Sequence, residues 1–202
     1  MKTFRAFRQK TAQFHTLQPR IREVGLALMA ITVLMFTLTP LDVSIQRLFY
    51  NPEGRLMHAW PLQYLALWKF LYRYGFWPAI LVAGGAFVLL VAGFFRANLA
   101  RYRVHCYFLV LVLSLGPGLL VNLVLKEHWG RPRPREIQEF GGRREYLPAA
   151  VRGQSGRGKA FPCGHSAIGY YLGVFYFLFR RRGKTVGLLL LALSLLYGTA
   201  MG

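Results

Sequence analysis

FWPAILVAGGAFVLLVAGFF, residues 76–95, decides the fold, because this stretch of twenty residues contains no charged side chain. At a rise of about 1.5 Å per residue, an α-helix of about 20 residues crosses the hydrocarbon core of a bilayer. A buried helix in a small soluble protein rarely lacks every charge. The stretch therefore predicts a membrane-spanning helix.

Four further apolar stretches have about the same length: residues 24–41, 104–125, 161–179 and 185–201. Together with 76–95 they predict an all-α fold, a multi-pass transmembrane helix bundle with five spans present. A cleavable signal peptide is the alternative for 24–41, since basic residues precede it. No small-residue cleavage pattern follows, because the chain continues into Thr39-Pro40-Leu41-Asp42.

Charge is distributed unevenly along the chain. The chain is 54% hydrophobic and 15% aromatic, yet its net charge is +19. The charges gather in short stretches between long apolar ones, which excludes a disordered chain and an ordinary soluble domain. We expect a basic cytoplasmic segment at 1–23, lying against anionic lipid headgroups, followed by one membrane domain at 24–202. The expected partners are lipids, with no nucleic acid among them.

The orientation in the membrane is not decided by counting cations, because Lys and Arg divide evenly between the two sides of the bundle. Short connections packed with Arg, such as 180–184, are typical of the cytoplasmic side. An anionic ligand outside would explain the many cations of the loop 126–160. We therefore predict an inner-membrane protein with its N-terminus inside and its active site on the extracytoplasmic side.

The first loop, 42–75, alternates aromatic residues with Arg and Lys. This mixture is typical of a segment at headgroup depth, with the rings forming an aromatic belt that has no part in chemistry. The alternative is that the loop shapes a side entrance for a lipid.

The long loop carries the candidate site. It begins with KEHWGRPRPR at 126–135 and runs into FPCGHS at 161–166. Both ends must lie at the same membrane surface, so Lys126, Arg133 and His165 are predicted to converge. A Lys, an Arg and a His in one place suit a phosphate ester, since cations neutralise its oxygens and an imidazole protonates the leaving oxygen. Gly164 would add a backbone N–H at a helix start.

Each of these residues has an ordinary explanation when taken alone. Lys126 could anchor a helix end at the interface, Arg133 could belong to a solvated basic loop, and His165 could cap a helix. The combination favours a phosphate site. Asn122, one helical turn before Lys126, is expected to face the same site.

Two motifs resemble the signatures of the type 2 phosphatidic acid phosphatase superfamily. Lys126, six intervening residues and then Arg133-Pro134 is similar to its first signature, Lys-x6-Arg-Pro. Pro162-Cys163-Gly164-His165 is similar to its second, Pro-Ser-Gly-His. Their order and their placement at the end of the third span and the start of the fourth also fit the family.

The resemblance implies a fold of six helices and metal-independent hydrolysis of a lipid phosphate through a phosphohistidine intermediate, with no cofactor. Lys126 and Arg133 would hold the phosphate oxygens together with Cys163 and the N–H of Gly164, and His165 would be the general acid. The candidate substrates are phosphatidic acid, phosphatidylglycerol phosphate, an isoprenyl diphosphate and lipid A phosphates. The loop acids form no compact cluster for a metal ion: Glu127, Glu136, Glu139 and Glu145.

Two departures from the family pattern matter. Cys163 stands where the family usually has Ser. The third signature, Ser-Arg-x5-His-x3-Asp, supplies the nucleophilic His, and no His follows His165 in these 202 residues. We therefore expect a truncated chain that is inactive alone. The alternative function is a non-catalytic protein that binds or transports anionic lipids.

Overall fold

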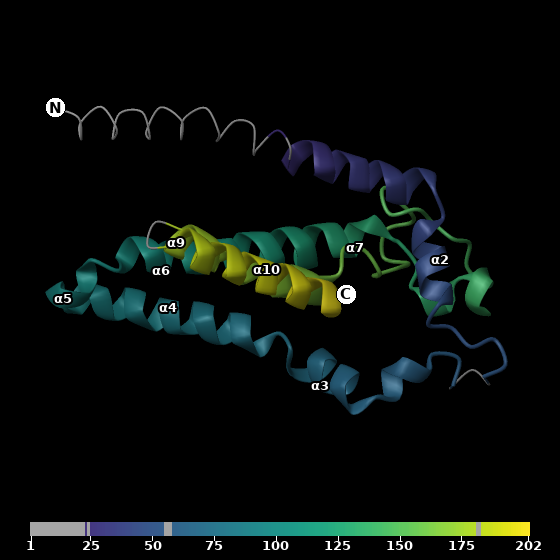
Figure 1. Ribbon diagram of the computed structural model, residues 1–202, viewed down its shortest axis with the longest axis horizontal. Coiled ribbons are helices and arrows are strands. Elements are labelled where there is room, and N and C mark those ends of the chain that lie inside the picture. The colour runs from purple at the N-terminus through teal and green to yellow at the C-terminus, as the bar shows by residue number, and fades with distance from the viewer. Residues whose placement is uncertain (1–22, 24, 55–57, 181–182) are drawn as a thin grey trace.

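Helices account for most of the structure, a computed structural model that describes residue 23 and residues 25–54, 58–180 and 183–202 (Figure 1). Within these ranges the only β pairing is an isolated bridge between Ile137 and Arg144, so the predicted all-α class is confirmed. The longer helices are Gly25–Leu38, α2 (Leu41–Arg47), α3 (Ala66–Tyr74), α4 (Trp77–Phe95), α6 (Arg103–Leu113), η2 (Ser114–Leu125), α8 (Gly164–Tyr171), α9 (Val174–Phe179) and α10 (Lys184–Ala200). Single turns complete them at η1 (Pro61–Tyr64), α5 (Ala97–Ala100), α7 (Lys126–Trp129), η3 (Pro134–Glu136) and η4 (Gln138–Phe140).

α4 and α6 form an antiparallel hairpin through α5. The buried face of α4 consists mainly of small residues at helical spacing, which let neighbouring backbones approach closely: Ala79, Ala83, Ala86, Leu90 and Gly93. Large side chains such as Leu81 and Val88 face outward, as expected for a helix in contact with lipid. Arg103 closes the hairpin, since its Nε donates to the carbonyl of Gly93 at 2.9 Å.

η2 continues α6 as a π-helical stretch, with wider turns than an α-helix. Pro117 lies inside it and has no N–H to donate, so the regular α-helical ladder cannot pass through this position. The Asn122 side chain donates from Nδ2 to the Pro117 carbonyl at 2.7 Å, which gives that oxygen a partner. Asn122 is thereby fixed on the part of the helix that leads to Lys126.

The stretch predicted as the fourth span forms two short helices, α8 and α9, with a break at Leu172 and Gly173. α10 packs along both. Gly169 and Gly198 are in such close contact that a Cβ at Gly169 would lie 2.6 Å from the Cα of Gly198. The hydroxyl of Ser194, buried at 2% exposure, donates to the Gly169 carbonyl at 3.2 Å. These contacts hold the C-terminal end of α8 against the C-terminal half of α10.

Helix length supports two membrane spans, Ala66–Phe95 and Arg103–Glu136, and a third if the bent pair Gly25–Leu38 and Leu41–Arg47 is one span. The second predicted span therefore begins earlier than residue 76, because α3 leads into α4. The helix that begins the first predicted span ends at Leu38 rather than 41. Pro40 lies between this helix and α2, and the two are bent by 73° from each other. Residue 24 lies outside the described residues. The count of five spans stays a prediction.

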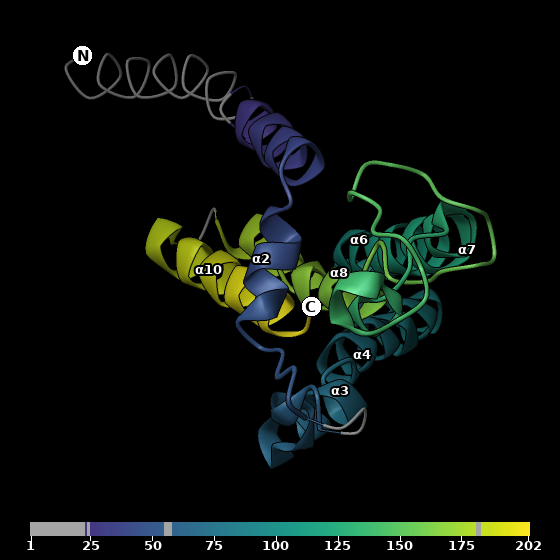
Figure 2. The ribbon, with the colours of Figure 1, turned by 90° about the vertical axis from the view of Figure 1, so that its right-hand side faces the viewer.

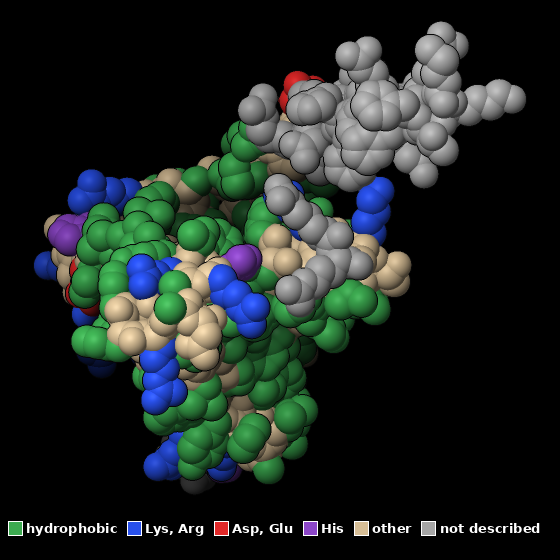
Figure 3. All heavy atoms as spheres, turned by 90° about the vertical axis from the view of Figure 1, so that its left-hand side faces the viewer, with side chains coloured by type: hydrophobic (Ala, Val, Ile, Leu, Met, Phe, Trp, Pro, Cys, Tyr) green, Lys and Arg blue, Asp and Glu red, His purple; other side chains and the backbone are tan. Residues whose placement is uncertain are grey.

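The two ends of the bundle differ in character. α5 and the end of α9 lie at one end, and α7, the long loop and Gly202 lie at the other (Figure 1). Lys and Arg side chains are spread over the α5 end, where Asp and Glu are scarce (Figure 3). The helix Gly25–Leu38 projects away from the bundle, whereas α2 lies across the loop end (Figure 2). The chain thus brings α2, the long loop and the start of α8 together.

Candidate active site

The two ends of the long loop lie side by side. The N–H of Gly153 donates to the carbonyl of Trp129 at 2.8 Å, and the N–H of Ala160 donates to that of Arg131 at 3.0 Å. An ion pair of 2.7 Å joins Lys159 to Glu127. Residues 127–131 and 153–160 therefore run against each other, and the predicted meeting of the loop ends is confirmed.

Gly158 permits this close pairing. A Cβ at this position would collide with the backbone carbonyl of Arg131. Gly130 has a φ of 75°, in the left-handed region, and lies against the backbone of Gln154. The turn after α7 consequently depends on Gly130, and the close approach of the two loop segments depends on Gly158.

The start of α8 lies against η2. Gly164 is buried, and a Cβ there would collide with the Asn122 amide. Lys126 follows Asn122 by four residues on the same helical path, so it belongs to the same side of the helix. Asn122 thus lies beside the predicted phosphate-binding turn, as expected. Tyr171 fixes α8 from its other end, donating from its hydroxyl to the Leu109 carbonyl at 3.0 Å.

The predicted site residues have different surroundings. Lys126 is half-buried and Arg133 is exposed. Among the described residues, no hydrogen bond or ion pair engages either cationic head group. The backbone N–H of Arg133 donates to Glu136 Oε2 at 3.0 Å, which fixes the main chain at this position. Both cations are therefore available to a ligand.

His165 points toward α3. Its ring stacks on Tyr72 with centroids 4.8 Å apart and planes 20° apart. Its Nε2 lies 3.2 Å from the Tyr72 carbonyl oxygen, so a proton on Nε2 would be donated there. The contacts with Tyr72 of α3 give the ring a defined orientation, which the motif alone did not predict.

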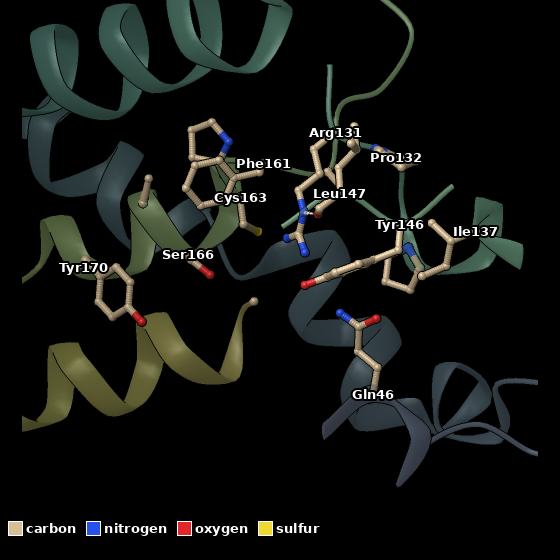
Figure 4. A pocket seen from close by; sticks show the side chains of 15 residues that line it. Gln46, Arg131, Pro132, Ile137, Tyr146, Leu147, Phe161, Cys163, Ser166 and Tyr170 are labelled. Atoms are coloured by element: carbon tan, nitrogen blue, oxygen red, sulfur yellow. Dashed lines mark hydrogen bonds between the residues drawn. The ribbon is translucent and has the colours of Figure 1, made fainter. Parts of the chain in front are cut away.

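A cavity of about 450 Å³ opens beside the second motif (Figure 4). Its lining residues come from α2, the long loop, the turn before α8, α8 itself and Gly202: Gln46, Arg131, Pro132, Pro134, Ile137, Tyr146, Leu147, Ala160, Phe161, Pro162, Cys163, Ser166, Ala167, Tyr170 and Gly202. Of the predicted site residues, only Cys163 lines this cavity. The cation in its wall is Arg131, and the placement of Lys126, Arg133 and His165 around one phosphate stays a prediction.

Sequence reasoning missed three residues that support this cavity. Asp42, at the start of α2, forms an ion pair with Arg131 and accepts a hydrogen bond of 2.5 Å from the Tyr146 hydroxyl. Burial and this bond to the carboxylate raise the pKa of Tyr146 to about 12. In the sequence, the only pointer to this ion pair was Asp42 itself, which is one of seven acidic residues in the chain. Its partner Arg131 lies 89 positions further along the chain, so the sequence did not link the two.

Part of the aromatic first loop packs onto the long loop. Tyr50 and Trp60 lie against Phe140, with ring centroids 5.0 and 5.1 Å away. Phe140 is buried together with Val43 and Ile137. The first loop is therefore more than an interfacial belt, since it forms a small apolar core at the loop end of the bundle.

An apolar helical bundle with a basic loop that returns to a Gly-His helix start fits the membrane phosphatase that the two motifs predict. The model of the PAP2 superfamily matches residues 104–202, which include both motifs. The chain belongs to the PAP2 superfamily, the type 2 phosphatidic acid phosphatases.

Three curated relatives carry the name lipid A 4'-phosphatase. The one from Francisella tularensis subsp. novicida is 30% identical over 176 residues, which are 86% of this chain and 75% of that protein. Those from Rhizobium etli and Rhizobium leguminosarum are 43% and 44% identical over 61 residues, 30% of this chain and 24% and 26% of theirs. No solved structure matches the chain.

Proposed function

We propose that the protein hydrolyses a phosphate monoester on a lipid of the lipid A type, at the extracytoplasmic surface of the inner membrane. The contact between Asn122 and Gly164 carries this proposal, because it joins the helix end that bears Lys126 to the first turn of α8. The names of the relatives favour lipid A over phosphatidic acid, phosphatidylglycerol phosphate or an isoprenyl diphosphate.

In the proposed reaction, Lys126 and Arg133 neutralise the phosphate oxygens. The N–H of Gly164 donates to one of them, since the first N–H groups of a helix have no intrahelical partner. His165 gives a proton to the leaving oxygen of the lipid as the bond to phosphorus breaks. Anionic headgroups around the site would be attracted by the remaining cations of the loop.

The phosphohistidine step of the proposal needs a second imidazole. A nucleophilic nitrogen attacks phosphorus, the lipid oxygen leaves with the proton from His165, and water then releases phosphate from the histidine. His165 is the last histidine of the 202 residues. Gly202 lines the cavity and lies against the Ser166 side chain.

Phosphate release from the full-length protein tests the proposal. The substrates are lipid A, phosphatidic acid and phosphatidylglycerol phosphate in mixed micelles. His165→Ala is expected to abolish release. His128→Ala is the matched control, because His128 is an exposed histidine of the same loop whose Nδ1 bonds the Val124 carbonyl at 2.7 Å. Binding of these lipids without any release would favour the anionic-lipid carrier instead.

A further inference from the structure

Asp42 is a buried acid that the proposed reaction does not use. It is 8% exposed, at the first turn of α2. Three donors converge on its carboxylate: the Arg131 guanidinium, the Tyr146 hydroxyl at 2.5 Å and the Val43 N–H at 2.8 Å. A buried charge with this many partners is ordered, and it orders the groups that donate to it.

The partner of Asp42 lies in the cavity wall. The Arg131 Nε donates to the Leu147 carbonyl at 2.7 Å while its Nη2 bonds Asp42, so the guanidinium is held from two sides. Arg131 and Tyr146 project into the cavity from the loop, opposite Cys163 of the second motif and Ser166 in the first turn of α8 (Figure 4). A guanidinium has five N–H donors, so donors remain for a ligand.

Charge determines which ligand suits this wall. Asp42 and Arg131 together carry no net charge, and both side chains are nearly buried, at 10% and 14% exposure. An uncompensated Arg would attract any anion, including free phosphate. A compensated Arg offers directed donors without a net positive charge. The other polar side chains that line the cavity are an amide, hydroxyls and a thiol, and none belongs to Lys, Arg, Asp or Glu: Gln46, Tyr146, Cys163, Ser166 and Tyr170.

We propose that Asp42 is a positioning and specificity-determining residue, which fixes Arg131 in the cavity wall and cancels its charge. Arg131 then binds uncharged oxygens of the lipid headgroup, hydroxyl or ester, next to the phosphate held by the second motif. The identity of the ligand as a lipid rests on the proposed function. The effect of Asp42 on the charge of the cavity does not depend on it. It assigns α2 a part in substrate selection, although α2 lies far from both motifs in sequence.

Asp42→Asn tests the proposal, because the amide keeps an oxygen for Tyr146 and loses the charge that compensates Arg131. For the lipid substrate, KM is expected to rise about tenfold with kcat changed far less, as for a displaced binding group. Inhibition by inorganic phosphate is expected to strengthen severalfold, since the cavity gains a positive charge. Glu139→Gln is the matched control, because it removes one negative charge from an exposed position of the long loop. In this variant, KM for the lipid and the inhibition constant for inorganic phosphate should stay unchanged.

A purely structural role of Asp42 predicts a different result. The variant would then unfold at a lower temperature, and the folded fraction would keep the wild-type KM and phosphate inhibition. That outcome overturns the proposal. If Asp42→Asn does not fold, Arg131→Gln breaks the same ion pair by removing its cation. This variant leaves the negative charge of Asp42 uncompensated, so inhibition by inorganic phosphate should weaken. A strengthened inhibition would contradict the proposal.

A second readout does not need catalysis. Cys163 lines the cavity, and its alkylation by N-ethylmaleimide can be followed by peptide mass spectrometry, with Cys106, 4% exposed, as the internal control. Inorganic phosphate should protect Cys163 at lower concentration in Asp42→Asn than in the wild type. Equal protection in both would overturn the inference. If no lipid releases phosphate but Cys163 is still protected at a lower phosphate concentration in Asp42→Asn, the proposed function is refuted and the inference about Asp42 stands.

Discussion

The Asn122 amide lies directly against the backbone of Gly164, in the space that a Cβ would need. The two residues come from helices separated by the whole long loop, and their contact sets the distance between the Lys126 end of η2 and the first turn of α8. The hydrogen bonds and the ion pair between residues 127–131 and 153–160 hold the two helix ends together from the loop side as well.

Gly164→Ala should therefore displace the two motifs from each other. We expect a loss of about 1–3 kcal/mol in stability, the usual cost of overpacking, and a large loss of phosphate release. Gly84→Ala is the matched control, since nothing lies within 4 Å of a Cβ at Gly84 on α4. Thermal unfolding in detergent and phosphate release measure both effects. A Gly164→Ala variant with wild-type activity would show that the contact between Asn122 and Gly164 is not needed to align the two motifs.

The sequence predicted the parts of this molecule that depend on local pattern. The charge-free stretch at 76–95 forms α4, and the motifs lie at helix ends as their placement required. The break between α8 and α9 was missed, because an apolar run does not reveal where its helix is interrupted.

The missed contacts depend on tertiary structure. The pairing of Asp42 with Arg131 joins residues 89 apart and has no periodic signature. For the same reason, the sequence selected Arg133 from the basic loop through its motif, whereas only the fold places Arg131 in the cavity wall. Side-chain direction in an irregular loop follows from its packing, here on the Val43, Ile137 and Phe140 cluster.

Tyr72→Leu should lower kcat, because the stacked ring orients His165. The backbone carbonyl that accepts from Nε2 is kept, so only the stacking is lost. We expect a decrease in kcat of about tenfold with little change in KM. Tyr74→Leu is the control, as Tyr74 lies on the same helix and contacts the Phe70 ring instead, with centroids 5.3 Å apart. Equal kinetics for both variants would refute an orienting role.

Alkaline pH should weaken the contact between Tyr146 and Asp42. The pKa of Tyr146 in the folded protein is about 12, above its ordinary value of 10.0. Neutral Tyr146 therefore stabilises the fold fully below pH 10, and this contribution is lost as the pH rises toward 12. The difference in unfolding temperature between wild type and Tyr146→Phe should be smaller at about pH 11.5 than at about pH 9. Tyr102→Phe, at an exposed position, is the control; a difference that does not change with pH would contradict the assignment.

Phosphate release should be insensitive to chelators. In the part of the chain that the structure describes, no group of three or more His, Cys, Asp or Glu is placed to hold a metal ion. The loop acids Glu127 and Glu136 are instead paired with Lys159 and Arg144. Assays of the full-length protein with and without EDTA measure the effect. Loss of activity that Mg²⁺ or Mn²⁺ restores would refute the metal-independent mechanism.

Cys163→Ser should keep its activity. A cysteine at a helix start near cations could act as a thiolate nucleophile, but cysteine-dependent phosphatases carry an Arg six positions later, where this chain has Gly169. Cys163 Sγ lies 4.0 Å from the Met201 carbonyl, so a hydroxyl in its place has an acceptor within reach of a small adjustment. Serine would also restore the family's usual second signature. We expect kcat within a fewfold of wild type and loss of inactivation by N-ethylmaleimide, measured on the full-length protein. Complete loss of phosphate release in a folded Cys163→Ser variant would instead indicate that the thiolate attacks phosphorus, and His165 would then serve only as its acid partner.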